Sequence, residues 1–181
     1  MLSNTGNFLL FINIFLSSLI IYISLKCLKV KDNLIFKNIY QISLLQSTLV
    51  LICFFTLTAA FIISDFSLIT VYQNSHSLKP LFYKISGTWG NHEGSLLLWL
   101  LVLTLFIFIF LLRTKNQPIK YKILTLGFQQ VIIIGFFIFL IKTSNPFEYI
   151  FPIPNEGLVL NPILQDPALA IHPPILYLGY V

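Results

Sequence analysis

Charged side chains are scarce in this sequence. They make up only 9% of the 181 residues, whereas 57% belong to the apolar set of Ala, Val, Ile, Leu, Met, Phe, Trp, Tyr and Cys, and the mean hydropathy is +0.89. Soluble domains carry roughly 25% charged residues. Because so few polar side chains cannot cover a water-soluble globule, lipid must be the solvent for much of the chain. A self-standing soluble enzyme is thereby excluded.

The sequence also lacks the usual arrangements of catalytic and metal-binding residues. Its two cysteines, Cys27 and Cys53, fall on consecutive expected helices at different depths, which disfavours a disulfide or a shared metal. There is no nucleophile elbow, no phosphate-binding glycine loop and no pair of catalytic carboxylates. The stretch Gly-Asn-His-Glu-Gly does not make a metalloprotease, which needs two histidines four residues apart on one helical face. Nothing here predicts a complete catalytic site.

Long uncharged apolar runs are what the sequence has instead. A helix needs about 20 residues to cross a core of ~30 Å, and four runs approach that length: Phe8–Leu25, Leu44–Ile63, Leu96–Leu112 and Ile123–Ile141. No basic residues precede the first run and lysines follow it, which favours a retained anchor over a signal peptide. We therefore predict an all-α polytopic membrane protein, with four transmembrane helices plus the start of a fifth, in which residues 1–181 form a single membrane domain.

The positive charges are concentrated in two of the connections between the expected spans, and this bias indicates the topology. Eight of the eleven basic residues lie in the first and third connections, at Lys26, Lys29, Lys31, Lys37, Arg113, Lys115, Lys120 and Lys122. Since cytoplasmic loops carry the excess of Lys and Arg, we expect the N-terminus and two long loops, Asp65–Ser95 and Lys142–Pro174, to face outward. The same placement along apolar segments favours membrane lipid as the partner and argues against nucleic acid.

The first outward loop ends in a motif that leads directly into the third span. Trp89 is expected at the headgroup level, while Glu93 and Ser95 suit the first turn of a helix, as dipole partner and cap. His92 next to Glu93 is open to two interpretations. It is either a proton-transfer or ligand pair, or simply part of the helix start, and the residues alone favour the second.

Two further polar features have alternative interpretations. His172 is followed by Pro173 and Pro174, and because proline suits the first turn of a helix, we expect His172 at or just before the cap of the fifth segment. An imidazole there can ligate a metal or haem iron, or only cap the helix. The pair Gln129–Gln130 lies inside the fourth span, where interhelical hydrogen bonding is the simpler interpretation and a transport path the alternative.

Three strings in order give the sequence a family resemblance. They are Trp89-Gly-Asn-His-Glu-Gly-Ser-Leu-Leu-Leu-Trp99, Thr143-Ser-Asn-Pro-Phe147 and the stretch from Leu160 to Val181 that contains His-Pro-Pro. Together they resemble CcmF, the membrane subunit of the cytochrome c maturation haem lyase, in the haem-handling protein family. The motif residues whose role the resemblance leaves open are Trp89, Gly90, His92, Glu93, Asp166, Pro173 and Pro174.

The resemblance implies haem handling on the outer face. Members of this family accept haem from a membrane-tethered haem chaperone and present it to the Cys-X-X-Cys-His segment of apocytochrome c. His172 matches the family's His-Pro-Pro histidine, which implies that it is an axial ligand of the haem iron. The cofactor implied is therefore haem, held transiently and shared with a partner chain. The protein would supply binding and orientation for this chemistry.

Several family features are not in this sequence: the tryptophan-rich segment, a second outward ligand and two intramembrane histidines. We therefore expect the N-terminal part of a split haem lyase subunit, not catalytic alone, which works with the C-terminal part and with other maturation subunits. Only Ile175–Val181 follow the proline pair, too few to cross a bilayer, so we expect a partner chain to continue that helix. The alternative is a structural subunit of an inner-membrane assembly that has lost haem handling.

The expected location is the mitochondrial inner membrane, with the long loops facing the intermembrane space. The split form of the family and a composition rich in Phe, Ile and Asn favour it. The bacterial inner membrane is the alternative.

Overall fold

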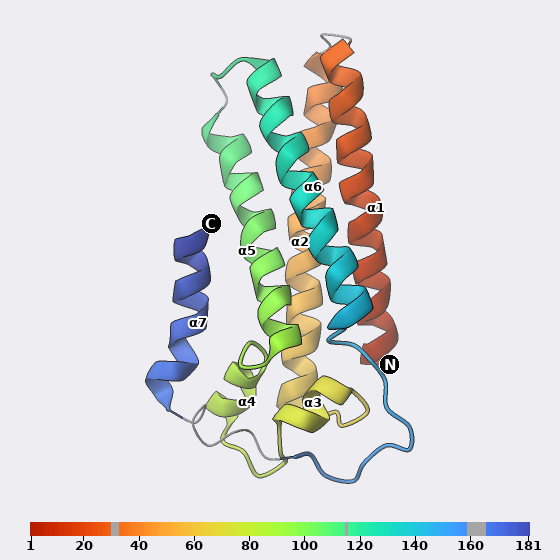
Figure 1. Ribbon diagram of the computed structural model, residues 1–181, viewed down its shortest axis with the longest axis vertical. Coiled ribbons are helices and arrows are strands. Elements are labelled where there is room, and N and C mark those ends of the chain that lie inside the picture. Colours follow the sequence, from red (N-terminus) through yellow and green to blue (C-terminus); the bar gives the residue numbers. More distant parts are fainter. Residues whose placement is uncertain (30–32, 115, 159–165) are drawn as a thin grey trace.

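A computed structural model describes residues 1–29, 33–114, 116–158 and 166–181, and all its regular elements there are helical (Figure 1). The helices are α1 (Leu2–Lys29), α2 (Asn33–Ile63), α3 (Ile69–Asn74), α4 (Leu81–Gly87), α5 (His92–Arg113), α6 (Ile119–Thr143) and α7 (Pro167–Tyr180). The predicted fold class is confirmed.

Four of these helices are long and apolar enough to cross a membrane, namely α1, α2, α5 and α6. Each contains one of the predicted apolar runs and extends past it at both ends or one end. The extension has a simple cause, since helical hydrogen bonding continues into flanking polar residues that reach the headgroup layer. The four helices stand side by side as a bundle in which α1 packs on α2 and α6, and α5 packs on α2 and α6.

Side-chain amides tie three of the spanning helices together at depth. Gln130 of α6 donates from Nε2 to Gln46 Oε1 of α2 at 2.9 Å, and Gln46 donates from Nε2 to Ser17 Oγ of α1 at 2.7 Å. Because water is excluded there, each buried amide needs such a partner. The interhelical interpretation is confirmed for Gln130. Gln129 differs, because its buried Oε1 has no hydrogen-bond partner among the described residues.

The two ends of the bundle differ in what they carry. The N-terminus, α3, α4 and the start of α7 lie at one end, which we call the loop end, and the end of α1, the start of α2, the end of α5 and the start of α6 lie at the other (Figure 1). This arrangement places the described helix ends that flank the two predicted basic connections at the same end of the bundle, whereas Lys31 and Lys115 lie outside the described residues. Which end faces the cytoplasm or matrix stays a prediction.

Cysteine labelling tests that orientation. Leu78 is 87% exposed at the loop end, and Gln117 is exposed in the connection between α5 and α6. In a Cys27→Ala, Cys53→Ala background, a membrane-impermeant maleimide applied from outside should label Leu78→Cys within minutes and leave Gln117→Cys unlabelled until the membrane is opened. Labelling of Gln117→Cys alone in sealed membranes would reverse the topology.

The fifth helix begins earlier than the sequence led us to expect. We expected its first residue at Pro173, but α7 starts at Pro167 with Asp166 as its cap. The Asp166 carboxylate accepts from the backbone N–H groups of Ala168 and Leu169 at 2.7 and 3.3 Å. An Asp cap followed by proline at the first position is the stronger start signal. The proline pair consequently lies inside the helix, and the second outer loop is shorter than predicted.

Candidate functional site

A cavity of about 250 Å³ opens at the loop end, where α5 meets α7 and the end of α4. It is lined by residues from the first and third sequence motifs: Ser86, Trp89, Gly90, Asn91, His92, Ser95, Leu169, Ala170, Pro173 and Tyr177. Two strings about 80 residues apart in the sequence therefore form one site. The structure brings four of the predicted site residues to this cavity, which are Trp89, Gly90, His92 and Pro173.

The start of α5 forms one wall of the cavity. Asn91 caps the helix, accepting from the Gly94 N–H at 2.7 Å through Oδ1 and donating to the Gly87 carbonyl at 2.6 Å through Nδ2. The expected cap, Ser95, instead donates its hydroxyl to the His92 carbonyl at 2.9 Å. A side chain at position 94 would collide with the carbonyl of Thr88. Glycine is therefore required there by close backbone approach.

Trp89 is not simply an anchor in the headgroup layer. Its indole stacks on Phe54 of α2, with ring centroids 6.4 Å apart and planes 15° apart. Its Nε1–H donates to the backbone carbonyl of Ala170 in α7 at 2.7 Å. One face of the indole and its N–H edge are thus engaged, and Trp89 joins α2 to α7.

His92 lies at the rim of the cavity and is exposed. The edge of its ring meets Phe139 of α6, with centroids 6.5 Å apart at 89°. Glu93 stands beside it in the first turn of α5, where its charge complements the helix N-terminus. The described contacts of His92 are therefore with Phe139 and Ser95, and the predicted pairing with Glu93 stays a hypothesis.

His172 occupies the opposite face of α7 from the cavity. It is the sixth residue of the helix and is exposed, whereas Ala170 is 6% exposed and faces the bundle. Successive helical residues are turned by about 100°, so His172 points away from α5. It shares that face with Ile175 and Leu176, which are 62% and 37% exposed. The structure therefore separates His172 from His92 instead of joining them.

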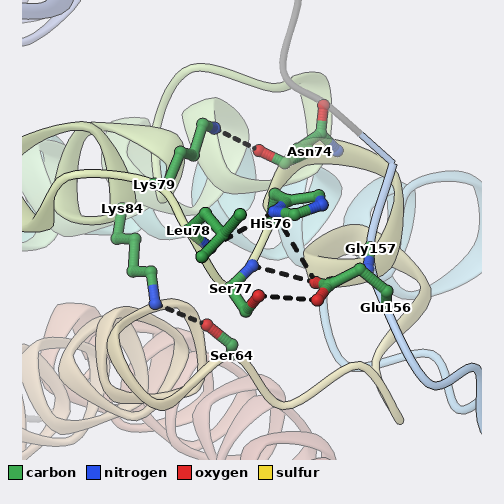
Figure 2. Close-up of polar contacts among 9 residues, drawn as sticks. All are labelled: Ser64, Asn74, His76, Ser77, Leu78, Lys79, Lys84, Glu156 and Gly157. Carbon is green, nitrogen blue, oxygen red and sulfur yellow. Dashed lines mark hydrogen bonds and ion pairs between the residues drawn. The ribbon is translucent and has the colours of Figure 1, made fainter.

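The two long loops at the loop end are fastened to each other through Glu156 (Figure 2). Its carboxylate accepts from the Ser77 N–H at 2.9 Å and from the Ser77 hydroxyl at 2.6 Å. His76 Nδ1 accepts from the Leu78 N–H at 3.2 Å and lies 3.9 Å from Glu156 Oε1. The hydrogen bonds from Ser77, and more weakly the one from the Gly157 N–H and the charge of His76, lower the pKa of Glu156 to about 2. This loop clasp is therefore present above the ordinary carboxyl pKa and is lost only as pH falls through about 2.

Two lysines stand next to the clasp. Lys79 Nζ donates to the Asn74 carbonyl at 2.8 Å, and Lys84 Nζ donates to the Ser64 hydroxyl at 2.7 Å (Figure 2). Burial, and then the nearby charge of Lys84, lowers the pKa of Lys79 to about 8. Both lysines are thus used to hold the loop in place.

The second sequence motif, Thr143–Phe147, anchors the loop after α6 to the start of α1. Asn145 accepts from the Phe147 N–H at 3.0 Å and donates to Asn7 Oδ1 at 2.8 Å. Ser3 donates its hydroxyl to the Phe147 carbonyl at 2.8 Å. The Phe147 ring lies directly against Gly6, where no side chain would fit. The motif therefore has a structural role at the loop end.

Some of these features carried no signal in the sequence. The hydrogen bond from Trp89 goes to the backbone carbonyl of Ala170. Because every residue type carries such a carbonyl, the sequence does not predict this bond. The clasp joins Ser77 and Glu156, which lie 79 residues apart in the sequence and outside the described helices. Within the third motif, residues 160–165 lie outside the described residues, and only its part from Asp166 onward can be placed.

Comparisons with known proteins agree on one family. The family described as cytochrome C assembly protein matches residues 89–181. The chain is 55% identical over 133 residues to the cytochrome c-type biogenesis protein CycK of Rhizobium meliloti, and 41% identical over all 181 residues to CycK of Bradyrhizobium diazoefficiens. It is 42% identical over 129 residues to the cytochrome c-type biogenesis protein CcmF of Escherichia coli.

The coverage of these matches is unequal. The alignments include 74%, 100% and 71% of this chain but only 20%, 27% and 20% of the three relatives. A solved structure described as cytochrome c heme lyase CcmF superimposes on 99% of this chain and 28% of its own, with a TM-score of 0.80 and 23% identity. At that identity the superposition shows a common fold. The chain thus spans about a quarter of the length of the proteins it matches.

Proposed function

Because this chain belongs to the cytochrome c assembly protein family, we propose that it is the N-terminal part of a membrane haem lyase that presents haem to apocytochrome c. The observation that carries the proposal is the placement of His172. It is an exposed imidazole on an otherwise apolar helical face at the loop end. The single-domain arrangement of the four spans would serve as the rigid support for that face.

The residues around His172 fit a haem. A neutral imidazole nitrogen is a normal axial ligand of haem iron. The neighbours on its face, Ile175 and Leu176, are apolar and exposed, and Gly179 has open space beside it. Such a face accepts the flat apolar surface of a porphyrin. A metal alone is a poorer fit, since the described residues contain no group of three or more His, Cys, Asp or Glu that could hold one.

The chain's own contribution is binding and orientation. His172 would hold the haem from one side, and the described part of the chain offers no second ligand on that face. The haem, when bound, supplies the vinyl groups to which cytochrome c cysteines attach. We therefore infer a transient site that is shared with another polypeptide. The chain is not catalytic alone.

The partners follow from the same proposal. This chain covers only 20–27% of the length of the three relatives. We propose that a separate C-terminal polypeptide supplies the remainder. The other partners would be maturation subunits, including the haem chaperone, and apocytochrome c. The relatives reported above are bacterial, which favours a bacterial inner membrane. The composition and the proposed split form instead support a mitochondrial inner membrane.

Haem binding by the native complex tests the proposal. The protein, purified through an affinity tag from its own membrane in mild detergent, is expected to retain or take up haem with a Soret band typical of histidine ligation. His172→Ala should lower haem affinity at least about tenfold, a cost found even when only the hydrogen-bond partner of a metal ligand is lost. The remaining part of the lyase should co-purify.

His76→Ala is the matched control, because His76 lies in the loop clasp, where it accepts the Leu78 N–H and stands 3.9 Å from Glu156 Oε1. It should bind haem like the native protein. Equal haem binding by His172→Ala and the native complex would remove His172 from the site. A native complex without any haem uptake would leave the structural-subunit alternative in its place.

A further inference from the structure

The proline pair of α7 opens two backbone acceptors inside the helix. In an α-helix each carbonyl accepts from the N–H four residues later. Proline has no N–H, so Pro173 and Pro174 leave the carbonyls of Leu169 and Ala170 without their helical donors. A proline ring also crowds the carbonyl four residues before it, which turns that carbonyl outward.

One of these two acceptors is occupied by a residue from another motif. The Trp89 indole N–H donates to the Ala170 carbonyl at 2.7 Å. Ala170 is the buried residue of α7, so this bond forms away from water, where an unpaired carbonyl is costly. The indole itself is fixed by stacking on Phe54 of α2. A rigid donor on the bundle therefore meets an acceptor that Pro174 leaves without its helical donor.

Few other contacts determine how α7 is rotated. It packs on α5 and α4. The ring of Tyr177 also stacks on Trp99 of α5, with ring centroids 5.6 Å apart. Its remaining faces are open, with Ile171, Ile175, Leu178 and Tyr180 all more than half exposed. A helix held along one face can turn about its axis. Any such turn would redirect His172 on the opposite face.

We propose that Trp89 and Pro174 form a rotational lock on α7: Pro174 opens the Ala170 carbonyl, the Trp89 N–H occupies it, and the bond fixes the direction in which His172 points. Trp89 is thus a positioning residue, since it acts through the helix and does not touch the ligand face. The consequence for haem rests on the function proposed above. The lock itself does not.

The test removes the indole N–H and measures both helix orientation and haem. Trp89→Phe keeps a ring against Phe54 but loses the donor. Replacing Trp89 with benzothienylalanine, which has sulfur in place of the N–H, preserves the volume if the phenylalanine variant fails to fold. Spin labels at Leu78→Cys and Leu176→Cys, in a Cys27→Ala, Cys53→Ala background, report the placement of α7 in the native complex. We expect a single narrow distance distribution with Trp89 and a broadened or shifted one without the N–H.

The haem readout should change in a way that a loss of stability alone would not produce. Haem affinity should fall about fivefold, the equivalent of one net hydrogen bond. The electron paramagnetic resonance g-values of the ferric haem, which depend on the orientation of the ligand imidazole, should shift. Unchanged g-values and an unchanged distance distribution in both Trp89 variants would overturn the lock.

The two prolines supply a matched pair of second variants. Pro174→Ala restores the N–H that competes for the Ala170 carbonyl, whereas Pro173→Ala restores the N–H that meets the Leu169 carbonyl. Both remove one proline from the same helix and change the unfolded chain alike. In double variants, the effect of Trp89→Phe on the distance distribution should shrink with Pro174→Ala and persist with Pro173→Ala. Equal persistence in both would also overturn the proposal.

The two proposals can fail separately. In the first case, the distance distribution changes when the Trp89 N–H is removed, but haem binding is unaffected by His172→Ala. This result supports the lock and overturns haem ligation by His172. In the second case, haem binding requires His172, but the distances and g-values do not change when the N–H is removed. This result supports haem ligation by His172 and overturns the lock.

Discussion

Replacing His172 with alanine is expected to abolish the covalent attachment of haem to cytochrome c in cells, while the protein stays in the membrane at its normal level. The side chain is exposed on α7, so we expect the stability of the protein to depend little on it. Its loss removes an imidazole from an otherwise apolar face. Haem staining of membrane cytochromes after gel separation measures the result, and we expect less than about one tenth of the native amount, by analogy with metal-site losses.

Two further variants make this result specific. His172→Gly should fail like the alanine variant, and added imidazole should partly restore attachment, because it can enter the space left by the side chain. His76→Ala should leave attachment near the native level. Normal cytochrome c in the His172→Ala strain would show that the proposed ligand is not used.

Replacing Gly94 with alanine should destabilise the site strongly. The added Cβ would collide with the Thr88 carbonyl and stand 3.2 Å from Asn91 Oδ1, the atom that caps α5. Overpacking of this kind costs about 1–3 kcal/mol, and losing the cap costs about 1 kcal/mol more. Thermal unfolding in detergent, followed by circular dichroism, should show a clear drop in Tm.

Gly127→Ala in α6 is the matched control for Gly94→Ala. Nothing lies within 4 Å of a Cβ built at Gly127. Because alanine is the better helix former by about 1 kcal/mol, this variant should unfold at the native Tm or slightly above it. A Gly94→Ala protein as stable as Gly127→Ala would mean that the turn from Thr88 to Gly94 is not as tight as the structure has it.

Much of the fold could be predicted because the membrane constrains it. A run such as Leu96–Leu112 has only one stable conformation in hydrocarbon, since every backbone group must bond within the helix. The start of α7 could not be predicted as safely. Two start signals compete in that stretch, at Asp166 and at His172, and the carboxylate cap prevailed because it satisfies two backbone N–H groups at once.

The candidate site was only partly predictable for a related reason. Residue types indicated Trp89 and His172, because an indole near a membrane surface and an imidazole beside two prolines are unusual. Their relation was hidden, since Trp89 reaches the helix of His172 through the Ala170 backbone carbonyl. The anchoring role of Asn145 was hidden in the same way, because its partners Asn7 and Phe147 reveal themselves only once α1 and α6 lie side by side.

The hydrogen bonds at the loop end also constrain the order in which the chain can assemble during synthesis. Residues near the N-terminus emerge first, yet Ser3 and Asn7 at the start of α1 find their acceptor and donor in Phe147 and Asn145. The loop after α2 likewise cannot form its hydrogen bond to Glu156 until that residue has been synthesised. Until the fourth span has formed and the loop that follows it has reached the loop end, these groups lack their partners in the chain. The loop end is therefore completed last, by residues that follow the fourth span, so a chain interrupted before Phe147 would leave the loop end unfinished.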